Sequence, residues 1–133
     1  MTRRRPAATI GRMAETLGAE FARALAAKDF GRVEVLLHPE IDFRGLTPRR
    51  DWAANDAGAV ISGVLRQWFG DAEEIEALIA LDCDGFADRE RVGYRFRVRT
   101  PKGRFLVEQQ AYLATRDGRI GWMRVVCSGF RRV

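Results

Sequence analysis

Three polar residues in the second half of the chain, Tyr94, Gln109 and Arg124, are the main candidates for chemistry. Each lies in a segment where apolar and polar residues alternate, the pattern of a half-buried strand. If Asp117-Gly118 forms a two-residue hairpin turn, Arg124 faces Ala111, and the same register continued backwards sets Tyr94 beside Gln109. All three side chains are therefore expected on an otherwise apolar sheet face.

A guanidinium on such a face needs a partner, because burying it unpaired is costly. Arg124 could hold a carboxylate or enolate oxygen of a ligand, or it could form an internal ion pair with Asp42. Tyr94 and Gln109 could orient the polar end of a ligand or satisfy each other. Arg124 and Tyr94 are the candidates for catalysis, and no general base can be named beside them.

Aromatic residues could form the wall of a binding pocket for a flat or terpenoid-like ligand. The alternative is that they are ordinary core residues. The aromatic residues in question are Phe21, Trp52, Trp68, Phe96 and Trp122.

Length and composition bound the possibilities. The 133 residues suit one domain, which we expect over residues 10–133 after a basic, flexible segment at 1–9. The net charge of +5 comes from 23 basic residues dispersed among 18 acidic ones, which does not indicate a nucleic-acid partner. No apolar run approaches the roughly 20 residues that cross a bilayer, so no membrane partner and a cytoplasmic location are expected.

The cysteines and the histidine offer little for metal or nucleophilic chemistry. Cys83 and Cys127 lack metal-ligand spacing, and a single histidine, His38, excludes a multi-histidine site. His38 precedes Pro39 at a helix end, where a cap or a solvated residue is the alternative to a catalytic base. We therefore expect neither a bound metal nor a cofactor.

Hydrophobic periodicity and turn residues predict an α+β fold, with three N-terminal helices packed in the concave face of a curved, mostly antiparallel sheet. The sheet is expected to be a meander because short turns join its last four strands. The predicted helices are 10–27, 30–37 and 57–69, the predicted strands are 41–46, 74–86, 91–100, 104–115 and 119–130, and a loop is expected at 47–55.

The opposite sheet face is expected to be polar and to carry a cross-strand ladder of Asp82, Arg95 and Glu108. The same register places apolar residues of the last strand on this outer face, which suggests a partner surface. A homodimer through the face is the expected assembly. Its predicted contact residues are Arg95, Glu108, Met123, Val125 and Cys127.

The order of elements, with the segments 26–30 (Ala-Ala-Lys-Asp-Phe) and 36–39 (Leu-Leu-His-Pro), resembles the nuclear transport factor two-like superfamily, which includes SnoaL-like and ketosteroid isomerase-like domains. The resemblance covers roughly residues 10–131 and implies a cone-shaped α+β barrel with an interior pocket. The superfamily holds isomerases, cyclases, epoxide hydrolases and domains without catalysis, so the fold alone does not select an activity.

Residue comparison narrows the activities that the resemblance implies. The tyrosine and aspartate of the isomerases align with Phe21 and Gly45, which argues against steroid isomerisation. The epoxide hydrolases use an Asp-Arg-Asp cluster, and Arg124 lacks an evident pair of inward acids. The expectation is a SnoaL-like protein that binds a small, mostly apolar organic molecule, with cofactor-independent cyclase, isomerase or hydratase activity left open. The alternative is a non-catalytic dimerisation or assembly module with a filled interior.

Overall fold

The computed structural model describes residues 15–133, so the basic segment 1–9 and the beginning of the predicted first helix lie outside the described residues. The first described helix, α2 (Leu17–Ala26), begins where the Thr16 hydroxyl accepts a hydrogen bond from the Ala19 amide. Helix α3 (Phe30–Leu36) is capped in the same way by the carboxylate of Asp29. Both helices fall within their predicted ranges.

The third helical segment is continuous and consists of α4 (Ala57–Val60), the π-helical turn η1 (Ile61–Leu65) and α5 (Arg66–Trp68). The Asp56 carboxylate caps its start, as an aspartate before an apolar periodic run predicts. This segment confirms the helix predicted for 57–69, although a helical pattern gives no indication of the wider π turn.

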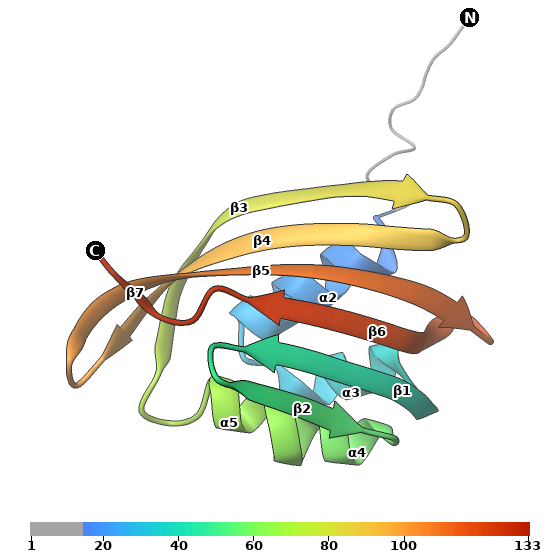
Figure 1. The fold of residues 1–133 in the computed structure, drawn as a ribbon, viewed down its shortest axis with the longest axis horizontal. Coiled ribbons are helices and arrows are strands. Elements are labelled where there is room, and N and C mark those ends of the chain that lie inside the picture. Colours follow the sequence, from blue (N-terminus) through green and yellow to red (C-terminus); the bar gives the residue numbers. More distant parts are fainter. Residues whose placement is uncertain (1–14) are drawn as a thin grey trace, which may run out of the picture.

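Within residues 15–133, seven strands form one sheet, and Figure 1 shows it curving over the helices. Neighbouring strands run in the order β2-β1-β6-β5-β4-β3, with β7 added to β5. All pairs are antiparallel except β1 with β6. The strands are β1 (Leu37–Thr47), β2 (Arg50–Ala54), β3 (Glu74–Phe86), β4 (Arg89–Thr100), β5 (Gly103–Arg116), β6 (Arg119–Cys127) and β7 (Arg131–Arg132).

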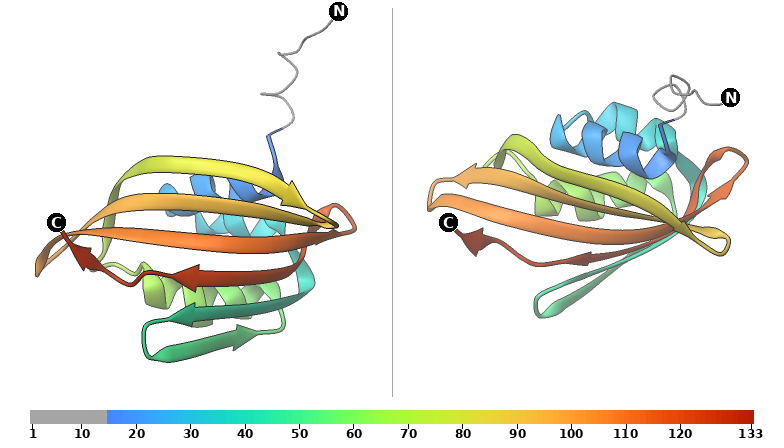
Figure 2. Two further views of the ribbon diagram at one scale, coloured as in Figure 1. Left: turned by 45° about the horizontal axis from the view of Figure 1, so that its top comes forward. Right: turned by 90° about the horizontal axis from the view of Figure 1, so that it is seen from above.

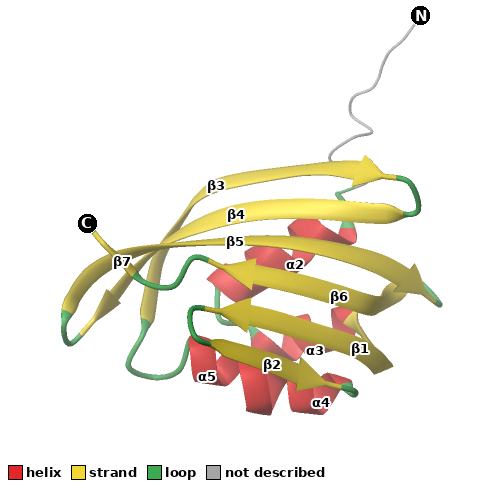
Figure 3. Ribbon diagram, in the orientation of Figure 1, coloured by secondary structure: helices red, strands yellow, loops and turns green. Residues whose placement is uncertain are grey.

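The predicted α+β architecture is confirmed, since Figures 2 and 3 show the helices together on one side of the curved sheet. The loop predicted at 47–55 is wrong in part, because residues 50–54 form the edge strand β2. Pro48 and Arg49 make the turn between β1 and β2, and Arg49 has a positive φ of 72°. The sequence pattern missed β2 because it has few buried residues.

The predicted register holds for the pairs of β4 with β5, where Tyr94 lies opposite Gln109 and Phe96 opposite Val107. It fails in β6, although the predicted turn at Asp117-Gly118 forms. Gly121 is an extra residue there, a β-bulge that shifts all later pairs by one.

The bulge reverses the two faces of β6. Met123, Val125 and Cys127 are buried in the core, and Trp122 and Arg124 are only partly buried. A β-carbon at Gly121 would lie 2.5 Å from Cβ of Arg116, which explains why a glycine occupies the bulge. The expectation that Arg124 and Trp122 point into the interior is therefore wrong.

Candidate functional site

A pocket of about 560 Å³ is lined by residues of α5, the β4–β5 turn and the segment after β6. Figure 1 shows the β4–β5 turn and the C-terminus on the left. We call this pocket the end pocket. It is lined by Thr47, Gln67, Trp68, Phe69, Ala72, Glu73, Thr100, Pro101, Lys102, Phe105, Cys127, Gly129 and Phe130. Its volume lies within the range of sites that hold small organic molecules.

Aromatic rings dominate the walls of the end pocket. Phe130 lies 6.1 Å from Phe69 and 5.9 Å from Phe105, measured between ring centroids. Gly129 has a positive φ of 76°, and this turn brings Phe130 back toward the two other rings. Phe130 is 37% exposed whereas Phe69 is fully buried, so the ring of Phe130 stands at the entrance. Such walls favour flat or apolar ligands.

Trp68 forms the part of the wall nearest to β1. Its six-membered ring lies against Gly45, where a β-carbon would approach Cη2 of Trp68 to 2.8 Å. Trp52 meets the same indole edge-on at 5.9 Å, and Phe43 lies at 6.2 Å. Gly45, which the resemblance aligns with the aspartate of the isomerases, is therefore covered by an indole in this chain.

The charged groups of the end pocket, Glu73 and Lys102, come from the loop after α5 and from the β4–β5 turn. Among the described lining residues, Glu73 is the sole carboxylate, and its Oε1 accepts a hydrogen bond from the Gly70 amide at 2.8 Å. The Lys28 ammonium holds the same loop by donating to the backbone carbonyls of Gly70 and Glu73. One carboxylate oxygen of Glu73 thus holds the loop in place, and Glu73 lies at the wall of the end pocket.

Tyr94 and Gln109 lie deeper, in a filled part of the interior. The Tyr94 hydroxyl donates to Oε1 of Gln109 at 2.6 Å, and both residues are almost completely buried. Desolvation is the main cause that raises the pKa of Tyr94 far above its ordinary value. The prediction that the two residues satisfy each other is confirmed for this bond, although Nε2 of Gln109 has no partner among residues 15–133. Neither residue lines the end pocket.

Arg124 lies on the outer sheet face, where its guanidinium pairs with the Asp42 carboxylate at 3.2 Å. It also donates to the Asp42 carbonyl at 3.0 Å and lies 4.5 Å from the centre of the Trp122 ring. The side chains of Arg124 and Asp42 are 32% and 52% exposed. The predicted ion pair exists, but it is not buried, and neither residue can orient a ligand in the interior.

The structure brings few of the predicted aromatic ligand contacts to the end pocket. Phe21 and Phe96 are fully buried and pack on Tyr94 at 6.4 and 5.1 Å. Trp52 donates its indole N–H to Oγ1 of Thr47 at 2.9 Å and does not line the end pocket. Of the predicted set, Trp68 lines it. Sequence reasoning missed Phe69, Phe105 and Phe130, and only the position of Phe130 beside Gly129 gave a hint.

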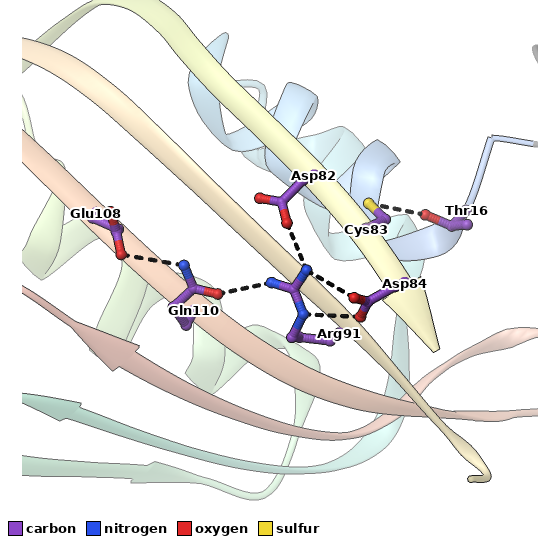
Figure 4. A network of polar contacts seen from close by, with 7 residues as sticks. All are labelled: Thr16, Asp82, Cys83, Asp84, Arg91, Glu108 and Gln110. Carbon is purple, nitrogen blue, oxygen red and sulfur yellow. Dashed lines mark hydrogen bonds and ion pairs between the residues drawn. The ribbon is translucent and has the colours of Figure 1, made fainter. Parts of the chain in front are cut away.

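The outer face carries a polar network around Arg91, drawn in Figure 4. Arg91 pairs with Asp82 and Asp84 and donates to Oε1 of Gln110 at 3.0 Å, and Gln110 in turn donates to Glu108 at 3.2 Å. These residues come from β3, β4 and β5, so the network ties three strands together.

The predicted ladder is confirmed in one half, since Arg95 pairs with Glu108 at 2.7 Å. Its other half is wrong, because Asp82 lies opposite Gly93 and pairs with Arg91 instead of Arg95. A β-carbon at Gly93 would lie 2.7 Å from Oε1 of Gln110, so this glycine lets the Gln110 amide lie across β4. Arg95 is the main cause that holds the pKa of Glu108 below its ordinary value.

The prediction that apolar residues of β6 lie on the outer face, as part of a dimer surface, is also wrong. Met123, Val125 and Cys127 are buried in the core, while Glu108 and Arg95 lie on the outer face as expected. Cys127 lies opposite Gln109 and reaches the end pocket instead. The assembly itself remains a prediction.

His38 is not available as a base. Its Nδ1 accepts the Glu40 amide at 3.0 Å, and its Nε2 lies 3.2 Å from Oδ2 of Asp117. Both ring nitrogens are therefore engaged, which favours a structural role for His38 over a catalytic one. Within residues 15–133 no group of three or more histidine, cysteine and acidic residues is arranged to hold a metal, and no described helix is long and apolar enough to cross a membrane.

No protein-family model matches this sequence, and neither does any curated protein. Solved structures do match. An NTF2-like protein from Burkholderia thailandensis has a TM-score of 0.67 at 15% identity, covering 84% of this chain and 88% of that one. An LEH-like epoxide hydrolase of M. tuberculosis has a TM-score of 0.61 at 17% identity, covering 84% of this chain and 80% of that one.

A third structure is a Catenulispora acidiphila protein with a ketosteroid isomerase-like fold, solved in complex with trimethylamine. Its TM-score is 0.65 at 15% identity, with 86% of this chain and 87% of that one covered. These likenesses establish that the chain has the nuclear transport factor two-like fold. Because the identities are this low, they carry no activity over to this chain.

Proposed function

We propose that this protein binds a small, mostly apolar organic molecule in the end pocket. The observation that carries the proposal is a pocket of about 560 Å³ whose described lining includes four aromatic residues: Trp68, Phe69, Phe105 and Phe130. Of these rings Phe130 is exposed and Phe105 is partly exposed, and a ligand that removes their apolar surface from water is stabilised by that burial. The structural neighbour solved with trimethylamine is consistent with ligand binding on this fold.

Any catalysis in the end pocket would need a proton-transfer group there, and Glu73 has the right chemistry. Its carboxylate is partly buried at the wall. A cofactor-independent isomerase, cyclase or hydratase would use such a group as general base. Replacement of Glu73 by Gln would abolish that activity and leave ligand affinity within about threefold.

The binding proposal is tested with N-phenyl-1-naphthylamine, a neutral probe whose fluorescence rises in apolar surroundings. Ala72 is an exposed residue of the pocket wall, and Ala72→Trp would fill the pocket. Ala80→Trp adds the same side chain at an exposed position on β3 away from the pocket. We expect wild type and the Ala80 variant to bind the probe and the Ala72 variant to lose at least about tenfold in affinity. Equal binding by all three would contradict the proposal.

The second candidate is an assembly module without a ligand, and the filled interior around Tyr94 and Gln109 favours it. Under this alternative the aromatic residues of the end pocket would contact another protein. The wild-type chain would then fail to bind the probe and any compound of an apolar metabolite library, as measured by thermal stabilisation.

A further inference from the structure

A second hollow, of about 280 Å³, lies where β2, β1 and β6 run side by side (Figure 1). We call it the outer pocket, because its exposed side chains belong to the sheet face turned away from the helices. It is lined by Arg44, Gly45, Leu46, Asp51, Trp52, Ala53, Arg124, Val125 and Val126. It is distinct from the end pocket, with which it shares no lining residue.

Two arginines stand opposite each other in the outer pocket. The parallel register of β1 and β6 pairs Arg44 with Arg124. Like charges at directly opposed positions of a sheet repel each other. Asp42 compensates Arg124, with its carboxylate 3.2 Å from the guanidinium, whereas no acid lies within ion-pair distance of Arg44 among residues 15–133. The guanidinium of Arg44 is therefore left without an ion-pair partner among the described residues, although Asp51 also lines the pocket.

The guanidinium of Arg124 is held in a fixed position by several contacts. Its Nη1 donates to the carbonyls of Asp42 and Met123 at 3.0 and 2.9 Å, and its guanidinium lies over the Trp122 ring. Arg44 is exposed and free of such contacts among the described residues. A carboxylate could therefore contact the ordered guanidinium of Arg124 and the adjustable guanidinium of Arg44. Both groups can donate charge-assisted hydrogen bonds to it.

Apolar side chains adjoin the arginines. Leu46 and Val126 form the next cross-strand pair on the same face of β1 and β6. They are 49% and 56% exposed, which leaves two branched side chains in water beside the arginines. Ala53, opposite Arg44 on β2, is too small to cover them. An anion with a carbon body would cover this apolar pair while its charge met the guanidinium groups.

We propose that the outer pocket binds a small organic carboxylate, with the carboxylate against Arg44 and Arg124 and the carbon body over Leu46 and Val126. The one guanidinium without an ion-pair partner among the described lining residues, that of Arg44, suits a ligand with a single negative charge. Asp51 lies at the rim, opposite Leu46, and disfavours a ligand with several negative charges.

The test titrates the full chain with phenylacetate and, separately, with the neutral isostere phenylacetamide, followed by amide chemical shifts. We expect phenylacetate to bind in the millimolar range, shifting amides of β1 and β6, and phenylacetamide to bind at least about tenfold more weakly. Arg44→Gln should lose about tenfold in affinity for phenylacetate. Arg97→Gln is the matched control, because Arg97 is also exposed and without an ion pair among the described residues.

Three results would overturn the proposal. The first is equal loss of affinity in the Arg44 and Arg97 variants, which would indicate attraction by net charge alone. The second is loss of phenylacetate binding in Ala72→Trp, which would place the anion in the end pocket. The third is the absence of binding together with a dimer that Val126→Asp dissociates in sedimentation, which would make a second copy of the chain the occupant.

Discussion

The indole of Trp68 lies against the α-carbon of Gly45, close enough that a β-carbon at that position would be 2.8 Å from Cη2. The contact determines where the wall of the end pocket stands, because Trp68 lines the pocket from the other side. A residue on β1 that does not line the pocket therefore controls its width.

Gly45→Ala should push the Trp68 ring away from β1 and narrow the end pocket. We expect the free energy of unfolding to fall by about 1–3 kcal/mol, the usual cost of an added methyl group in a packed site. Urea unfolding measures this loss, and probe fluorescence measures the accompanying loss of affinity. Gly63→Ala is the control, since no heavy atom lies within 4 Å of the added carbon. An unchanged affinity in Gly45→Ala would contradict the role of Trp68 as a pocket wall.

The hydrogen bond between Tyr94 and Gln109 predicts a non-additive pair of substitutions. Tyr94→Phe leaves the Gln109 amide buried without its donor, and Gln109→Leu leaves the Tyr94 hydroxyl without its acceptor. Each should cost about 1–3 kcal/mol of unfolding free energy. The double variant removes both polar groups and should cost clearly less than the sum. Strictly additive losses in urea unfolding would mean that the two side chains do not depend on each other.

The pairing of Glu108 with Arg95 predicts a loss of stability in acid. The folded state lowers the pKa of Glu108 below its ordinary value of 4.5, chiefly through the hydrogen bond from Arg95. A lowered pKa stabilises the fold above the ordinary value, and this contribution disappears as pH falls through the lowered pKa.

Glu108→Gln should therefore be less stable than wild type at neutral pH, and the difference should shrink as the solution is acidified. Urea unfolding across this pH range checks it. Glu34→Gln is the control, because Glu34 is exposed and forms no ion pair among residues 15–133. A difference between wild type and Glu108→Gln that stays constant down to acid pH would show that the ion pair does not contribute.

Strand β6 shows most clearly which features of the structure can be predicted from the sequence. The turn at Asp117-Gly118 and the pairing of Tyr94 with Gln109 follow from local residues and alternation, and both predictions are confirmed. The bulge at Gly121 reverses the faces of the strand, and Arg124 consequently lies outside. A glycine inside a strand is itself a signal of a bulge. With a bulge at Gly121, the alternation of side chains along β6 places Arg124 on the outer face.

The end pocket was harder to predict because its walls come from three segments far apart in sequence. Phe69 follows α5, Phe105 lies near the start of β5 and Phe130 follows β6. Their meeting depends on the curvature of the sheet and on the turn at Gly129, neither of which hydrophobic periodicity reports. Helices and hairpins form from residues that are close in sequence, whereas the end pocket forms from residues that are far apart in sequence.

A map of amide chemical shift changes on saturation with N-phenyl-1-naphthylamine tests most directly whether the end pocket is the ligand site. We expect the largest changes at Phe69, Phe105 and Phe130, and little change at Leu46 and Val126 of the outer pocket. Changes confined to the outer sheet face, or none at all, would contradict the account.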